Sequence, residues 1–290
     1  MSPGKRLRLT IEAKGLAHVM AGHSPLSALL VDEAGFDGVW ASGFELSALH
    51  GLPDMSLMSM TQHLDMVRAM VAATTLPVVA DIDTGFGNAV NVVHAVKCYE
   101  QAGAAAVVIE DKIFPKVSSL TCGGRQELAG IEEFRGKIAA AVAARRDPDF
   151  LVVARTEALI AGFGLNEALR RAAAYEAAGA DMILVHSKQA VPEEIEGFAK
   201  AWSGHTPIVI VPTTYPQLTE YRIRELGNIA MVIYGNHAIR ASIAAMRSTF
   251  ARIRRDGSAV NADCDLVSVD DVFELQGMAE IRKIEEKFLR

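Results

Sequence analysis

Eight short apolar segments recur along the chain, and each is followed by a stretch with helical periodicity. Their continuous Val, Ile and Ala character is typical of parallel strands that are covered on both faces. Eight alternations of strand and helix predict an α/β fold, a (β/α)8 barrel of the TIM type, with a doubly wound open sheet as the alternative. The segments are residues 17–21, 38–41, 77–80, 105–109, 150–154, 181–185, 207–211 and 230–233.

The stretches between and after these segments carry the helical patterns. Residues 91–102 and 165–178 each place apolar side chains on one face, as a helix packed on a sheet does. Residues 238–255, 269–276 and 279–288 predict three further helices, with a loop over 261–267. We therefore expect one barrel domain over 1–290, with 256–290 as its C-terminal helical extension. Such an appendage usually covers a neighbouring subunit, which predicts a homo-oligomer.

Composition excludes several classes of protein. The 290 residues include 29 Lys and Arg against 35 Asp and Glu, a net charge of −6 without a basic run, so nucleic acid is not an expected partner. No segment is apolar and long enough for a signal peptide or a membrane span, and no membrane partner is expected. Three cysteines are too few for a disulfide framework and fit the reducing cytoplasm.

Polar and ionisable residues follow nearly every apolar segment, whereas mostly turn residues precede them. In a barrel of this type the active site lies at the carboxyl ends of the strands, so this asymmetry indicates an enzyme. The residues that close the segments are His23, Trp40, Ser42, Gly43, Asp81, Asp83, Glu110, Lys112, Arg155, Glu157, His186, Ser187, Pro212, Thr213, Tyr234, Asn236 and His237.

Carboxylates end two successive segments, Asp81 and Asp83 after the third and Glu110 and Asp111 after the fourth. Dense negative charge at one rim of a sheet is costly unless a cation balances it. Hard carboxylate oxygens suit Mg²⁺ or Mn²⁺, and Mg²⁺ keeps several waters beside few protein ligands. The alternative is that Asp83 or Asp111 caps the helix that follows.

Three cationic or titratable residues lie close to this rim in the predicted barrel. Lys116 belongs to a long segment, 114–125, of the kind that forms active-site lids, although a plain surface loop would also fit. Arg155 suits a carboxylate or phosphate anion, or else a buried ion pair with Glu157 or Glu110. His186 would donate to an anion beside Arg155, or else be a core histidine.

Five motifs together identify the chain as similar to the phosphoenolpyruvate mutase/isocitrate lyase superfamily, over essentially its whole length. They are WASGFE (40–45), DIDTGFGN (81–88), EDKIFPK (110–116), VARTEA (153–158) and YGNH (234–237). Within the superfamily, the chain most resembles members that hydrolyse phosphonopyruvate. That resemblance lies in FELSA (44–48), RQEL (125–128), YPQLTE (215–220) and YGNHAIRA (234–241).

The resemblance implies a barrel whose C-terminal helices are exchanged between the subunits of a homodimer or homotetramer, and a gating loop. It implies a Mg²⁺ site, open to Mn²⁺ or Co²⁺, formed by Asp81, with Asp83, Glu110 and Asp54 acting largely through water. It implies that Trp40, Ser42, Gly43, Phe44, Arg155 and His186 bind the substrate. It implies a catalytic set of Asp54, Lys116, Ser118, Arg155 and His186.

The implied reaction is hydrolysis of the P–C bond of 3-phosphonopyruvate to pyruvate and phosphate, through an enolate that Mg²⁺ stabilises. Ser118 stands where the mutases carry Asn, the hydrolases Thr and the lyases a catalytic Cys, whereas Thr156 is more typical of the lyases. Ser keeps the hydroxyl of Thr, which favours hydrolysis over mutase chemistry. The catalytic Cys of the lyases is absent, which makes C–C lyase or oxaloacetate-cleaving chemistry the weaker alternative. Whether Ser118 is the nucleophile or positions a water stays open.

Overall fold

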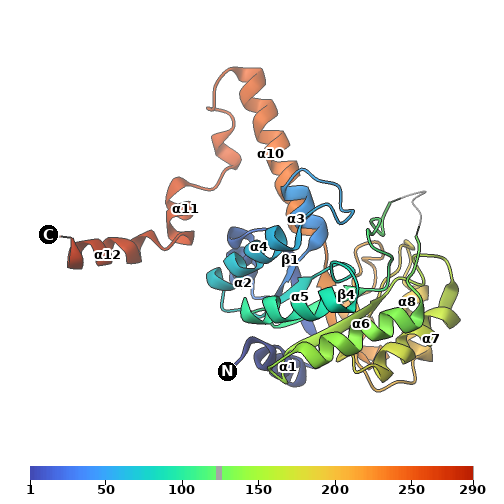
Figure 1. The fold of residues 1–290 in the computed structure, drawn as a ribbon. Coiled ribbons are helices and arrows are strands. Elements are labelled where there is room, and N and C mark those ends of the chain that lie inside the picture. The colour runs from blue at the N-terminus through green and yellow to red at the C-terminus, as the bar shows by residue number, and fades with distance from the viewer. Residues whose placement is uncertain (122–125, 290) are drawn as a thin grey trace. The chain divides into compact units, whose positions relative to one another are not determined.

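The computed structural model describes residues 1–121 and 126–289, and within these ranges eight parallel strands close into a barrel (Figure 1). Each strand pairs with the next, and β1 pairs with β8, so the predicted barrel is confirmed and the open sheet is wrong. Each predicted strand boundary agrees to within two residues. The strands are β1 (Ala17–Gly22), β2 (Gly38–Ala41), β3 (Val78–Asp81), β4 (Ala106–Glu110), β5 (Leu151–Thr156), β6 (Met182–Val185), β7 (Ile208–Ile210) and β8 (Ile229–Tyr234).

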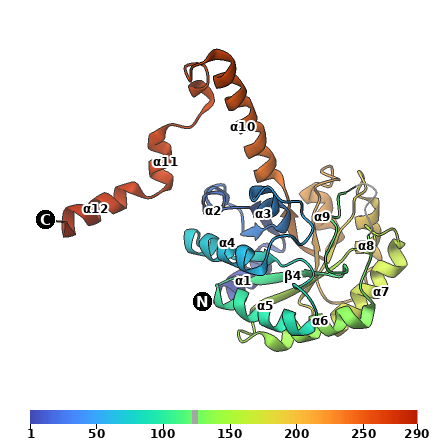
Figure 2. The ribbon, with the colours of Figure 1, turned by 45° about the horizontal axis from the view of Figure 1, so that its top comes forward.

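Helices follow the strands and cover the outside of the barrel (Figure 2). Helix α1, which the sequence analysis did not assign, begins after Ser2, whose hydroxyl accepts from Lys5 N. The helices of this part are α1 (Pro3–Lys14), α2 (Pro25–Glu33), α3 (Gly43–Leu49), α4 (Met60–Ala73), α5 (Ala89–Gln101), α6 (Ile131–Ala144), α7 (Gly164–Ala177), α8 (Glu193–Ala201) and α9 (Glu220–Leu226).

The strands separate two buried cores. Alternate residues such as Val79, Ala106 and Val108 point into the barrel and pack in one cluster. Their neighbours, such as Val107 and Ile109, pack outward with the covering helices in a second, larger cluster. Because side chains alternate along a strand, the last inward residue of each strand faces the mouth of the barrel.

The chain divides into two compact units, residues 1–238 and residues 239–290. The second unit contains most of α10 (His237–Asp256), followed by a 3-10 turn at Asp263–Asp265, α11 (Val269–Leu275) and α12 (Met278–Phe288). The predicted C-terminal helices are therefore present, although the predicted loop 261–267 contains that turn. Among the described helices, none is both long and apolar enough to cross a membrane.

Candidate active site

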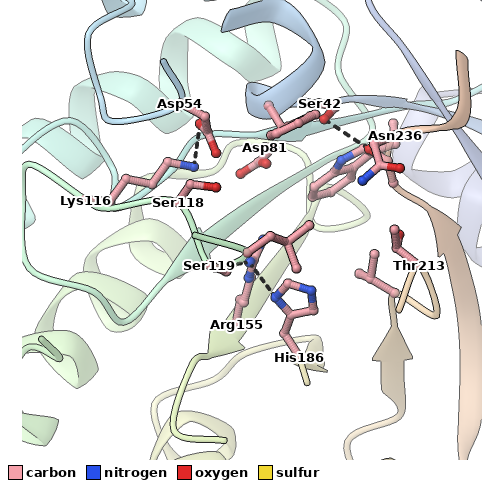
Figure 3. A pocket seen from close by; sticks show the side chains of 15 residues that line it. Ser42, Asp54, Asp81, Lys116, Ser118, Ser119, Arg155, His186, Thr213 and Asn236 are labelled. Carbon is pink, nitrogen blue, oxygen red and sulfur yellow. Dashed lines mark hydrogen bonds and ion pairs between the residues drawn. The ribbon is translucent and has the colours of Figure 1, made fainter. Parts of the chain in front are cut away.

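The mouth of the barrel holds a pocket lined by residues that follow several strands and by the loop after β4 (Figure 3). Asp81, Arg155 and His186 line it because each continues the inward-facing series of its strand. Trp40, also inward on β2, is buried in the wall of this pocket. Of the residues predicted to form the site, those that line this pocket are Trp40, Ser42, Phe44, Asp54, Asp81, Lys116, Ser118, Arg155 and His186.

Four carboxylates, which we call the acidic cluster, gather on one side: Asp54, Asp81, Asp83 and Glu110. Lys116 reaches into it, with Nζ 2.9 Å from Asp54 Oδ1, 2.7 Å from Asp83 Oδ1 and 4.0 Å from Glu110 Oε1. The Lys116 side chain is 4% exposed, so the alternative of a plain surface loop is wrong. The structure thus brings all four acids and the lysine together.

Burial dominates the electrostatics of the acidic cluster. It raises the pKa of Asp83 to about 7, and it raises the pKa of Asp81 even though Lys116 and Arg155 oppose the shift. Burial alone would lower the pKa of Lys116, but Asp83, Glu110 and Asp54 outweigh it and hold that pKa well above its ordinary value. One ammonium therefore does not fully compensate the cluster, as expected for a cation site.

The donor set of the acidic cluster fits a hard cation. Both carboxylate oxygens of Glu110 are buried and accept no hydrogen bond from any described residue, a costly state that a cation or its waters would relieve. No three His, Cys, Asp or Glu side chains of the described chain are spaced to enclose an ion directly. A set of carboxylate oxygens suits Mg²⁺, which binds through few direct protein ligands and several waters.

The turn after β3 carries Asp83 in a strained conformation. Asp83 has φ 51° and Gly85 has φ 84°. A side chain at Gly85 would also place its Cβ 2.4 Å from Val92 Cγ2, so glycine is required. Lys137 of α6, a buried residue that sequence reasoning missed, donates from Nζ to Thr84 O at 3.1 Å and supports the turn.

The capping alternative is wrong for both aspartates. Asn88, not Asp83, caps α5, through a hydrogen bond from Val90 N to Asn88 Oδ1. Asp111 lies behind the pocket, where Oδ2 accepts from Tyr175 Oη at 2.6 Å and from Arg171 Nη1 at 3.0 Å. Asp111 therefore joins α7 to the carboxyl end of β4 and does not reach the pocket.

Across the pocket, Glu157 is the centre of a second buried group, which we call the Glu157 cluster. Its Oε1 lies 2.7 Å from Arg155 Nε and 3.1 Å from His186 Nδ1, and its Oε2 lies 3.3 Å from Lys112 Nζ. Ser119 Oγ donates to Glu157 Oε2. The ion pair proposed as an alternative for Arg155 is thus present, and Arg155 also lines the pocket.

Cations outnumber the acid in the Glu157 cluster, the reverse of the acidic cluster. Burial alone would raise the pKa of Glu157, but Arg155, His186 and Lys112 hold it well below its ordinary value. Burial, and then Arg155, lower the pKa of His186, so the imidazole is neutral at pH 7. The surplus positive charge of Arg155 and Lys112 makes this side of the pocket suitable for an anion.

The described part of the loop after β4, residues 114–121, is the lid loop; residues 122–125 of the predicted segment lie outside the described ranges. Lys112 Nζ anchors the lid loop by donating to Val117 O at 2.6 Å and to Ser119 Oγ at 2.8 Å. Ser118 and Ser119 both line the pocket. Sequence reasoning singled out Ser118 and missed Ser119, which makes the contacts to Arg155 and Glu157.

The turn after β2 borders the acidic cluster. Ser42 Oγ accepts from Glu45 N at 3.2 Å and donates to Gly235 O at 3.4 Å. A Cβ at Gly43 would lie 3.1 Å from Asp83 Oδ1 and 3.4 Å from an Asp81 oxygen, so this backbone approaches the acids closely because residue 43 is glycine. The predicted residues Ser42 and Phe44 line the pocket, and Gly43 lies behind them.

Known proteins with similar sequences identify the family of this chain. Residues 8–254 match the family model described as phosphoenolpyruvate phosphomutase. The chain is 55% identical to a phosphonopyruvate hydrolase of Variovorax sp., over 290 residues that cover all of both chains. It is 46% identical to a phosphoenolpyruvate phosphomutase of Tetrahymena pyriformis, over 98% of this chain and 94% of that protein.

Solved structures of the same two kinds of enzyme also resemble the chain. A phosphonopyruvate hydrolase in complex with oxalate and Mg²⁺ is 54% identical, with all of both chains covered and a TM-score of 0.95. A phosphoenolpyruvate phosphomutase from Streptomyces platensis subsp. rosaceus is 48% identical, with 99% of both chains covered and a TM-score of 0.96.

Proposed function

Because the chain belongs to the phosphoenolpyruvate phosphomutase family, as its motifs predicted, we propose that it hydrolyses the P–C bond of 3-phosphonopyruvate to pyruvate and phosphate. The observation that carries this proposal is the 55% identity with a phosphonopyruvate hydrolase over the full length of both chains. The pocket supports it, because an under-compensated acidic cluster faces a side with surplus positive charge.

Mg²⁺ is the cation we propose for the acidic cluster, since the related hydrolase was solved with oxalate and Mg²⁺. Asp81 would bind it most directly, with Asp54, Asp83 and Glu110 acting largely through water. When bound, Mg²⁺ would supply the charge that stabilises negative charge developing on the 2-oxo oxygen. Mn²⁺ or Co²⁺ would substitute, because the ligands are oxygens that accept several divalent ions.

The residues of the chain would orient the substrate between the two clusters. The backbone of Ser42, Gly43 and Phe44 would hold the carboxylate, with Trp40 packed against the three-carbon unit. Arg155 and neutral His186 would donate hydrogen bonds to the phosphonyl oxygens. These bonds would offset the negative charge on those oxygens as the P–C bond breaks. The electron pair of that bond passes to the 2-oxo oxygen, and C3 later takes a proton to give pyruvate.

Water is the acceptor of the phosphorus group in hydrolysis, and the lid loop would place it. We propose that the Ser118 hydroxyl orients this water, because serine attacks well only beside a free base. The nearby groups that could serve as a base, His186 and Glu157, are bound to Arg155. Lys116, tied to Asp54 and Asp83, would keep the lid loop closed during the reaction.

A phosphorus NMR assay tests the proposal directly. The purified full-length chain with Mg²⁺ and phosphonopyruvate should produce inorganic phosphate and an equal amount of pyruvate. Phosphoenolpyruvate as the product would instead identify a mutase, the second candidate, which the similarity to the Streptomyces platensis enzyme favours. Pyruvate released from a panel of C4 and C7 2-oxo or hydroxy acids, without phosphate, would identify a C–C lyase. A Ser118→Ala variant with full hydrolysis would remove Ser118 from the mechanism.

We further propose that the chain forms a homodimer or homotetramer through exchanged C-terminal helices. Helices α11 and α12 have no buried residue, and they expose Val272, Phe273, Ile281 and Ile284. Apolar faces of this kind usually pack against a partner. Light scattering of the full-length chain should give the mass of two or four copies, and a monomer would contradict the proposal. The sparse cysteines support a cytoplasmic enzyme.

A further inference from the structure

The hydroxyl of Thr213 is buried and has no hydrogen-bond partner among the described residues, although Thr213 lines the pocket. Two other buried hydroxyls of the pocket are paired. Ser42 Oγ contacts Gly235 O, and Ser119 Oγ contacts Lys112 and Glu157. A buried hydroxyl without a partner loses its bonds to water without replacing them, so an unpaired one in a binding pocket indicates contact with a ligand.

The chain holds Thr213 in place, so its position is not that of a loose loop residue. Val209 and Val211 point into the barrel from β7 and the residue after it, and Thr213 lies in the turn that follows, where it lines the pocket. The next residue, Thr214, donates from Oγ1 to Ser187 O at 3.2 Å, and Gln217 donates to Ala190 O at 2.6 Å. Both contacts fix the segment after β7 to the segment after β6, which preorganises the hydroxyl.

The acidic cluster does not explain this hydroxyl. The unpaired oxygens of Glu110 lie at the end of β4 and belong to the proposed cation site. Thr213 is uncharged and follows β7, the neighbour of β6 in the closed barrel. Figure 3 shows Thr213 and His186 facing the same space, opposite Asp54 and Lys116. The ligand group that meets Thr213 is therefore at the end of the substrate away from the cation.

We propose that Thr213 is a specificity-determining residue, whose hydroxyl donates a hydrogen bond to a phosphonyl oxygen of the substrate. This inference rests on the proposed function. A phosphonyl group carries three oxygens, and Arg155 and His186 approach it from β5 and β6. A hydroxyl from β7 completes the set of donors without adding charge, and a hydrogen bond to a charged oxygen is stronger than one between neutral groups. Binding of the pyruvyl half should not depend on it.

The experiment compares Thr213→Val, which keeps the shape but removes the hydroxyl, with Thr213→Ser, which keeps the hydroxyl. In the full-length chain with saturating Mg²⁺, Thr213→Val should lower kcat/KM for phosphonopyruvate by about tenfold or more, and Thr213→Ser by less than about threefold. Oxalate lacks a phosphorus group, so its inhibition constant should stay within about twofold in both variants. Thr61→Val, the same change at an exposed residue of α4, is the matched control and should behave as the unmodified chain.

Three outcomes would overturn the inference. They are unchanged kinetics in Thr213→Val, an oxalate constant that rises as much as KM, or an equal selective loss in Thr61→Val. Failure of the proposed function is a separate result, since the unmodified chain would then release no phosphate. In that case calorimetric binding of 3-phosphonopropionate, an uncleavable phosphonate, replaces the kinetics. Weaker binding of it by Thr213→Val alone, with oxalate binding unchanged, would still support the role of Thr213, and equal binding would refute it.

Discussion

The acidic cluster and the Glu157 cluster are buried at the same barrel mouth, yet their charges are balanced in opposite ways. Asp54, Asp83 and Glu110 share Lys116, and Arg155 approaches only Glu110, at 3.4 Å. In the Glu157 cluster, by contrast, a single acid contacts three basic side chains, those of Arg155, Lys112 and His186. A buried carboxylate is therefore not itself evidence of a metal. What indicates a metal site is a group of carboxylates with too few cationic side chains nearby to balance their charge.

The largest expected effect comes from removing the acid placed to bind the cation most directly. Asp81→Ala should lower kcat by about a thousandfold or more, because stabilisation of charge at the 2-oxo oxygen depends on the bound cation. Calorimetric titration with Mg²⁺ should show lost or much weaker binding. Asp65→Ala, a change at an exposed acid on α4, is the matched control. Undiminished turnover and Mg²⁺ affinity in Asp81→Ala would contradict the cation site.

A second pair of variants tests the difference in charge balance itself. Glu157→Gln leaves Arg155 and Lys112 buried without their acid, so it should reduce the free energy of unfolding by about 3–5 kcal/mol. Glu110→Gln removes an acid that accepts no hydrogen bond from the described residues. Without Mg²⁺ it should therefore change stability by less than about 1 kcal/mol, or increase it. Urea unfolding at one fixed protein concentration measures both. Equal losses would mean that the two clusters do not differ.

The lid loop extends the comparison to the two neighbouring serines. Ser119 is bonded to the Glu157 cluster through Lys112, Arg155 and Glu157 itself. Ser119→Ala should weaken the closed position of the lid loop and lower kcat/KM by about tenfold, chiefly through KM. Ser118→Ala should act on kcat, because we propose that the Ser118 hydroxyl orients the acceptor water. Steady-state kinetics of the two variants separate these effects, and the reverse pattern would exchange the proposed roles.

Most of the fold and part of the site could be predicted from the sequence. Eight apolar segments predicted the barrel, and their position at the carboxyl ends of three successive segments predicted that Asp81, Glu110 and Arg155 share its mouth. Contacts between remote segments were not predictable in this way. Ser119 meets Glu157 across 38 positions of the chain, and Lys137 meets Thr84 across 53. Such contacts depend on loop conformation, which periodicity does not specify.

The smallest expected effect is a pH dependence with opposite signs in the two clusters. Without metal, burial raises the pKa of Asp83 to about 7 from the ordinary 3.8, so the folded chain binds this proton more tightly than the unfolded chain. The contribution of Asp83 to the free energy of unfolding should then fall as pH rises from about 4 to about 7. The pKa of Glu157 is held well below its ordinary value. Its contribution is therefore present above about pH 4.5 and is lost only as pH falls further.

Scanning calorimetry between about pH 5 and about pH 7.5 tests the acidic cluster by comparing the unmodified chain with Asp83→Asn. The comparison is needed because burial lowers the pKa of His63 to about 4 and also lowers the pKa of His186, so both histidines raise stability with pH in this window in either chain. With EDTA, the Tm of the unmodified chain should fall by a few degrees relative to that of Asp83→Asn as pH rises. With Mg²⁺ this relative fall should be smaller, since a bound cation favours the ionised carboxylates. A metal-free difference that stays level or rises would mean that Lys116 already compensates the acids, and the main argument for a cation there would fail.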